Sequence, residues 1–152
     1  MNKEDIYGPD WMELDWSPWC SLQPARGEIS DLPTQPGLYR VRHAELDGLV
    51  YIGETGRSVR ERVRSFASGT FDGEMPYRDP HTASPCVWAI IDRYGQDLEV
   101  SVVTPSEAAH KQQRKAMEDA LIALHRRVQN QSPVANFARI LPGYKQSSYR
   151  KD

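Results

Sequence analysis

The sequence has little of several features that define whole classes of proteins. It holds two cysteines, Cys20 and Cys86, which lie 66 positions apart without a CxxC spacing, so neither a disulfide framework nor a cysteine-based zinc site is expected. It has no long apolar run and a mean hydropathy of -0.66, which excludes a membrane-spanning helix. Its first residues lack the apolar core of a secretion signal. We therefore expect a cytoplasmic protein that does not contact a membrane.

An excess of positive charge is also missing. The 152 residues include 19 Lys and Arg against 21 Asp and Glu, a formal net charge of -2, which excludes a protein that holds nucleic acid by bulk charge alone. The charge is uneven, however, because residues 1–35 carry seven acids and two bases and the remainder has a net charge of +3. A solvated surface is the common explanation of such clustering, and an anion-binding domain behind an acidic arm is the alternative.

The composition that is present fits one ordinary globular domain, with 39% hydrophobic and 26% charged residues. We divide the chain into an acidic, Trp-rich arm over 1–35, a folded domain over 36–142 and a basic tail over 143–152. The tryptophans of the arm are expected to anchor it to the core rather than to stack on bases, because their surroundings are acidic: Trp11, Trp16 and Trp19.

The hydrophobic pattern predicts alternating strands and helices. Strands are expected over 38–43, 49–53 and 98–103, the first two joined through the turn Asp47-Gly48. Helices are expected over 58–68 and from Thr104 to about Gln129, where a capping box precedes the periodic segment. The segment 85–94 fits a short helix after Ser84-Pro85, and a strand is the alternative.

The long helix carries two stripes with different expected roles. Its predicted core stripe consists of Met117, Ala120, Leu121, Leu124 and Val128. A polar stripe on the same helix could form the wall of a site, and it consists of His110, Arg114, Glu118 and His125.

Two tripeptides on neighbouring predicted strands carry a family resemblance. They are Gly37-Leu38-Tyr39 and Tyr51-Ile52-Gly53, and they are followed by Arg62, Glu118 and Asn136. This ordered set resembles the signature of the GIY-YIG nucleases over roughly residues 36–140, with Leu38 where Ile is usual. The resemblance implies an α+β fold, with a small three-stranded antiparallel sheet flanked by helices. It also implies a divalent-metal endonuclease that hydrolyses phosphodiester bonds in one step, with DNA as the expected partner.

The resemblance assigns a role to each residue of the set. Glu118 would be the single protein ligand of a hydrated Mg²⁺ or Mn²⁺, although a solvated helix carboxylate is the plain alternative. Arg62 would bind the scissile phosphate with its planar guanidinium. Tyr39, with Tyr51 beside it, would orient or deprotonate the attacking water. Asn136 would hydrogen-bond within the site, or else be an ordinary turn residue.

One departure from the family pattern leaves a choice open. Phe66 stands four residues after Arg62, where many members have His or Tyr, and it cannot accept a proton. Either Tyr39 serves alone, or His81 from the loop 69–83 supplies the missing group; a surface histidine is about as well supported. A catalytically impaired nucleic-acid-binding module of the same fold is therefore the alternative function. The flanking arginines are expected to contact backbone phosphates: Arg57, Arg60 and Arg64. A restriction-type role would favour a homodimer.

Overall fold

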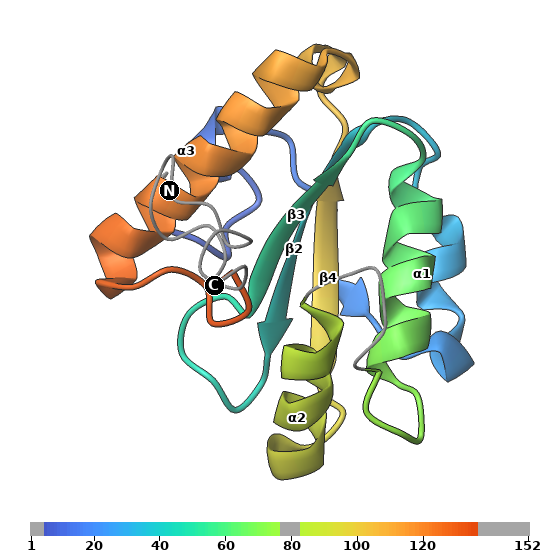
Figure 1. Cartoon of the computed structure of the whole chain (residues 1–152). Coiled ribbons are helices and arrows are strands. Elements are labelled where there is room, and N and C mark those ends of the chain that lie inside the picture. The colour runs from blue at the N-terminus through green and yellow to red at the C-terminus, as the bar shows by residue number, and fades with distance from the viewer. Residues whose placement is uncertain (1–4, 77–82, 137–152) are drawn as a thin grey trace, which may run out of the picture.

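The computed structural model describes residues 5–76 and 83–136 and is built around a four-stranded antiparallel sheet in the order β1-β4-β2-β3 (Figure 1). The strands are β1 (Cys20–Ser21), β2 (Gly37–His43), β3 (Tyr51–Thr55) and β4 (Leu98–Val103). The α-helices are α1 (Val59–Thr70), α2 (Ser84–Tyr94) and α3 (Lys111–Gln129), with short 3-10 turns η1 (Trp11–Glu13), η2 (Pro24–Arg26), η3 (Glu28–Asp31) and η4 (Ser106–Ala109). The predicted α+β class is confirmed, and the segment after Ser84-Pro85 is a helix.

The sheet has one strand more than predicted. β1 is two residues long and pairs antiparallel with β4, with Cys20 opposite Val100. The chain already follows this edge from Ser17, whose backbone N–H donates to the carbonyl of Val102 at 2.8 Å. So short a strand in an acidic, Pro-rich segment has no hydrophobic period of its own. Its pairing depends on the neighbouring strand, which is why the local sequence did not predict it.

Helices cover both faces of the sheet, and β2 is buried on both sides as a result. In Figure 1, α3 lies on one side of the strands and α1 and α2 lie on the other. Along β2, Tyr39 and Val41 join the apolar cluster under α1 and α2, whereas Leu38 joins the cluster under α3. This alternation follows the period of two of a strand, and it places the first tyrosine of the signature in the interior.

The N-terminal segment packs on the α3 side of the sheet, where it encloses the side chain of Arg40. Arg40 is fully buried and donates to the carbonyls of Ile6 at 2.7 Å and Gly8 at 2.8 Å. Its guanidinium lies over the rings of Trp16 and Trp19, 4.3 and 4.6 Å from their centroids. Burial lowers the pKa of Arg40 to about 9, so the group stays charged at neutral pH. Cation–π contacts and carbonyl acceptors thus stabilise this buried cation.

The long helix begins later and buries a different stripe than predicted. His110 has an extended backbone (φ -103, ψ 124), so the segment after Pro105 forms η4 first and α3 starts at Lys111. Of the predicted core stripe, Leu121 is buried, Met117 and Leu124 are half-buried, and Ala120 and Val128 are exposed. The buried stripe instead combines apolar with polar side chains: Arg114, Glu118, Leu121, Ile122 and His125. Within the described residues, none of the helices combines the length and apolar character that a membrane crossing requires.

His125 joins the end of α3 to the loop between β2 and β3. Its Nε2 accepts the backbone N–H of Leu49 at 2.9 Å, and its Nδ1 lies 2.7 Å from the carbonyl oxygen of Gln131. These partners require the neutral ring with its proton on Nδ1, because a carbonyl can only accept. Burial lowers the pKa of His125, against the opposing effect of the Gln131 carbonyl. This member of the predicted polar stripe is therefore a structural link.

We expect the free energy of unfolding to fall as the pH drops below about 6.5, the ordinary pKa of histidine. The unfolded chain takes up a proton there that neutral, folded His125 resists, so folding loses stability until the pH passes the lowered pKa of the folded state. Urea midpoints across this pH range, in wild type and in His125→Gln, measure the effect. The variant should be less stable at every pH but less dependent on pH; an equal decline in both proteins would contradict this assignment.

Candidate active site

Tyr39 and Gly53 face each other across β2 and β3, and the tyrosine ring lies directly over the glycine. The two residues are paired in the strand register. A Cβ atom at Gly53 would lie 2.4 Å from Cζ and 2.5 Å from the hydroxyl oxygen of Tyr39. The ring of Tyr39 thus explains why position 53, the last of the second tripeptide, is a glycine, because a larger residue there would displace that ring.

The phenol of Tyr39 belongs to an aromatic cluster with Tyr51 and Phe66. The centroids of Tyr39 and Tyr51 are 5.9 Å apart, and the ring of Phe66 stacks on Tyr51 at 5.5 Å with an interplanar angle of 17°. Phe66, the residue that departs from the family pattern, is fully buried in this cluster. The position at which the resemblance would imply a proton-accepting group is therefore filled here by a packed hydrocarbon ring.

Charged groups from two helices act on the hydroxyl of Tyr39. Burial raises the pKa of Tyr39 well above its ordinary value, and the neighbouring Tyr51 and the carboxylate of Glu118 raise it further. The guanidinium of Arg62, from α1, opposes this rise in the pKa as a nearby positive charge. Glu118, from α3, is 4% exposed. The fold thus brings Tyr39, Tyr51, Arg62 and Glu118 together from the sheet and two helices that flank it.

Asn136 acts on the main chain of β3. Its side-chain oxygen accepts the N–H of Ile52 at 2.8 Å, and its amide nitrogen donates to the carbonyl of the same residue at 2.9 Å. A buried amide therefore stands in for a neighbouring strand at the edge of the sheet, between Tyr51 and Gly53. In this structure Asn136 positions the strand that carries the second tripeptide.

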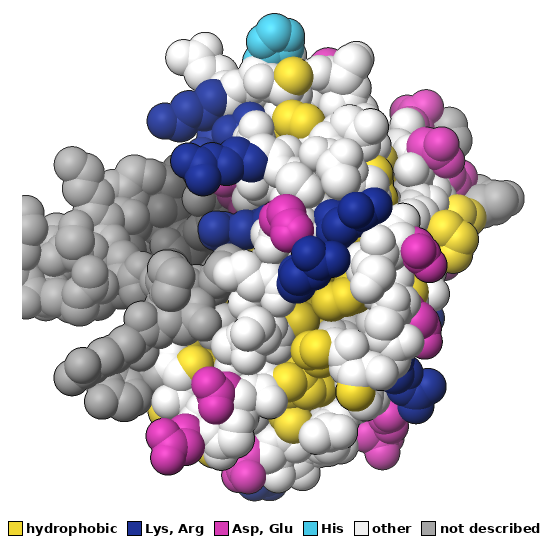
Figure 2. Space-filling view, turned by 90° about the vertical axis from the view of Figure 1, so that its right-hand side faces the viewer, with side chains coloured by type: hydrophobic (Ala, Val, Ile, Leu, Met, Phe, Trp, Pro, Cys, Tyr) yellow, Lys and Arg dark blue, Asp and Glu magenta, His cyan; other side chains and the backbone are white. Residues whose placement is uncertain are grey.

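A basic cleft of about 800 Å³, lined in part by Arg62, opens between the start of α1 and the start of α3. Its charged lining residues are Glu54, Arg57, Glu61, Arg62, Lys111, Arg114 and Lys115. Figure 2 views the face covered by α1, where Lys and Arg side chains gather over the upper half and acidic side chains lie mainly along the lower and right-hand edges. Arg62 thus belongs both to the surroundings of Tyr39 and to this cleft.

A buried ion pair supports the wall of the cleft. Nε of Arg114 donates to Glu54 at 2.5 Å, and a second nitrogen donates to the carbonyl of Ala108 at 3.0 Å. The ammonium of Lys115 lies 2.9 Å from the other oxygen of Glu54. Burial alone would raise the pKa of Glu54, but the hydrogen bonds from Lys115 and Arg114 outweigh it and lower that pKa. A Cβ at Gly56 would meet the Arg114 guanidinium at 2.8 Å, so this pair also shapes the loop before α1.

The other predicted site residues have different surroundings. Of the three arginines expected to contact backbone phosphates, Arg57 lines the cleft. Nε of Arg60 donates to the carbonyl of Leu32 at 2.7 Å, and Arg64 pairs with Glu61 at 2.8 Å. His81 lies outside the described residues.

The sequence analysis missed three charged residues of the cleft: Glu54, Lys111 and Lys115. Glu54 directly follows the second tripeptide. Lys111 and Lys115 precede Glu118 at helical spacing, so one face of α3 carries all three, and this spacing was the available signal.

The acidic groups suit a metal ion that takes few ligands from the protein. Among the described residues, no three His, Cys, Asp or Glu side chains lie close enough to form a ready-made metal site. Glu118 is the carboxylate whose charge acts on Tyr39. Mg²⁺ keeps several of its waters and is held by one or two carboxylates together with substrate phosphates. A single buried glutamate whose charge acts on the same tyrosine as Arg62 fits that requirement, whereas a multi-ligand zinc centre has no support in the described residues.

One curated protein is similar to this chain over most of the length of this chain. The UvrABC system protein C of Synechococcus sp. (strain CC9311) is 34% identical over 116 residues, which is 75% of this chain and 14% of that protein. The matched part is thus a small piece of the relative. No protein-family model matches the chain. No solved structure matches it either.

Proposed function

We propose that the chain is a metal-dependent endonuclease of the GIY-YIG type that hydrolyses phosphodiester bonds in DNA. The observation that carries this proposal is that Arg62 and Glu118, from two separate helices, both act on the buried hydroxyl of Tyr39, and that Arg62 also lines the basic cleft. The similarity to a protein named as part of the UvrABC system supports a role in DNA processing.

The chemistry divides among these residues by charge. Arg62 would bind the scissile phosphate, because its fork matches phosphate oxygens and keeps its charge. Glu118 would hold a hydrated divalent ion, which when bound lowers the pKa of water and neutralises charge on the phosphate. Tyr39 stays protonated at neutral pH because burial raises its pKa, so its hydroxyl orients the attacking water rather than carrying a permanent negative charge. The water oxygen forms the new bond to phosphorus while the opposite ester oxygen leaves and takes up a proton.

A nicking assay on supercoiled plasmid tests this function. Purified protein should relax the plasmid with Mg²⁺ or Mn²⁺ and leave it intact in EDTA. The burial of Phe66 against Tyr51 favours one other candidate, a nucleic-acid-binding module that has lost catalysis. That candidate would bind DNA in EDTA but cleave neither DNA nor RNA with either metal, which would overturn the endonuclease proposal.

We expect Arg62→Ala to reduce turnover by about 10²- to 10³-fold, the usual loss when one charge-stabilising donor is removed from a transition state. Arg60→Ala is the matched control on the same helix. Its Nε donates to the carbonyl of Leu32, so its loss should affect stability more than cleavage. Single-turnover cleavage rates at saturating protein separate the two, and a larger loss in the Arg60 variant would show that the roles are reversed.

A further inference from the structure

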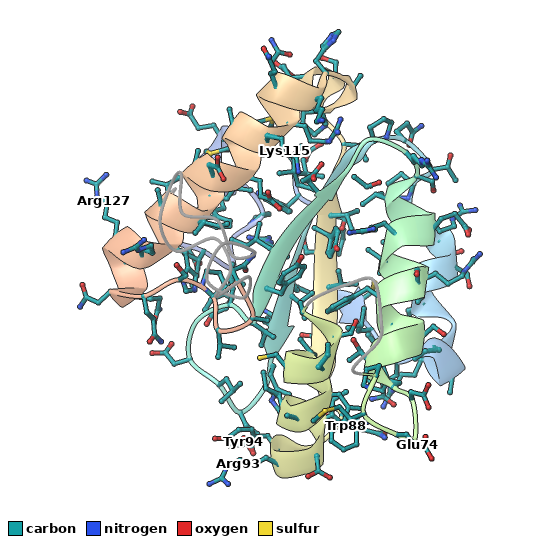
Figure 3. The ribbon with its side chains drawn as sticks, viewed as in Figure 1. Glu74, Trp88, Arg93, Tyr94, Lys115 and Arg127 are labelled. Carbon is teal, nitrogen blue, oxygen red and sulfur yellow. The ribbon has the colours of Figure 1, made fainter. Side chains whose placement is uncertain are left out.

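Two lysines on α3 face the cleft from the side opposite Arg57. Lys111 and Lys115 are one helical turn apart and both line the cleft, as does Arg57. The ammonium of Lys115 is held in place by Glu54, yet its side chain remains 43% exposed. Figure 3 shows Lys115 on the sheet-facing side of α3, whereas Arg127 projects away from the molecule at the far end of the same helix.

The charge balance of the cleft favours an anion that enters between the two helices. Glu54 is neutralised by Arg114 and Lys115, and Glu61 by Arg64, so neither acid offsets Arg57, Arg62 or Lys111. α1 and α3 also both begin at this cleft, so the positive ends of two helix dipoles add to the side-chain charge.

The outer face of α1 offers a weaker track for the same anion. Arg60 donates to the carbonyl of Leu32 and Arg64 pairs with Glu61, and neither lines the cleft. Lys115 also has a partner, Glu54, but it lines the cleft. Phosphate contacts set the register of a nucleic acid on a protein, so the path they take decides which bond reaches Tyr39 and Arg62.

We propose that Lys111 and Lys115, across the cleft from Arg57 and Arg62, bind backbone phosphates of the nucleic acid together with Arg57. The strand then runs between the starts of α1 and α3 rather than along the outer face of α1. This inference deepens the proposed function and rests on it for the identity of the ligand. Arg114 and Glu54 take no direct part; they fix the wall on which Lys115 stands.

The test compares two double variants that remove the same charge from one helix. Lys111→Gln/Lys115→Gln removes the cleft lysines, and Arg126→Gln/Arg127→Gln removes two exposed cations at the other end of α3. The affinity for a short fluorescent DNA duplex is measured in EDTA over a range of salt concentrations. The lysine variant should bind about tenfold more weakly at moderate salt, with a log–log salt slope reduced by about 1 for each lost contact. The arginine variant should match wild type in both quantities.

The outcomes separate this inference from the nuclease proposal. Equal weakening in both double variants would mean that bulk charge alone attracts the DNA. Unchanged binding in the lysine variant would mean that the strand passes elsewhere. Either result would overturn the proposed phosphate contacts of Lys111 and Lys115, while cleavage of the plasmid by wild type would still support the nuclease proposal. If wild type never cleaves but the lysine variant alone loses affinity, the phosphate track holds and the catalytic proposal falls.

Discussion

Replacing Glu118 by glutamine is expected to abolish cleavage while the protein still binds DNA. The change removes one negative charge and keeps the size of the buried side chain. A catalytic metal ion supplies several kcal/mol of transition-state stabilisation, and each 1.36 kcal/mol is a factor of ten, so the rate should fall by about 10³-fold or more. The measurement is the single-turnover rate with Mg²⁺, together with the affinity for duplex in EDTA.

The matched control for Glu118→Gln is Asp119→Asn, the exposed carboxylate that follows it on the same helix. This variant should cleave within about threefold of wild type, because its side chain faces away from the buried stripe of α3. Similar losses in both variants would mean a general effect of charge on the helix. Full activity in Glu118→Gln would place the metal on other residues.

The sequence predicted the elements of this fold best where their hydrophobic period was regular. The strands over 38–43 and 98–103 and the helix after Ser58 lie within two residues of their predicted bounds. The pattern failed where a tertiary contact overrides it. Val128 fits the apolar period of α3 but is exposed, and Glu118 breaks that period but is buried. Helix α3 faces both an apolar cluster and polar groups, so its buried side carries apolar and charged residues together.

The candidate site shows the same limit of local reasoning. The order of Tyr39, Tyr51, Arg62 and Glu118 along the chain was enough to name them as candidates, because it resembles the order of a known pattern. The ion pair between Glu54 and Arg114 joins residues 60 positions apart. Neither residue alone predicts that pair, and without it the positions of Gly56 and Lys115 have no explanation.

The close packing of Tyr39 on Gly53 predicts a large effect of a substitution at Gly53 on the stability of the fold. The backbone of Gly53 lies outside the left-handed region, so alanine fits its dihedral angles, and the three atoms nearest to an added Cβ all belong to the side chain of Tyr39. That ring is fully buried and cannot move aside without disturbing Tyr51 and Phe66. We therefore expect Gly53→Ala to lower the free energy of unfolding by about 3 kcal/mol or more, at the upper end of overpacking costs.

A double-mutant cycle isolates the cause of that loss. In a Tyr39→Leu background the ring is gone, so Gly53→Ala should cost at least about 2 kcal/mol less than in wild type, measured by urea unfolding. Gly73→Ala is the control, because a Cβ there meets no atom within 4 Å, and it should change stability by less than about 0.5 kcal/mol. Additive effects of the two substitutions would mean that Gly53 is needed for a reason other than the tyrosine. Strong coupling would instead establish that the two tripeptides are one steric unit, in which the glycine of one makes room for the tyrosine of the other.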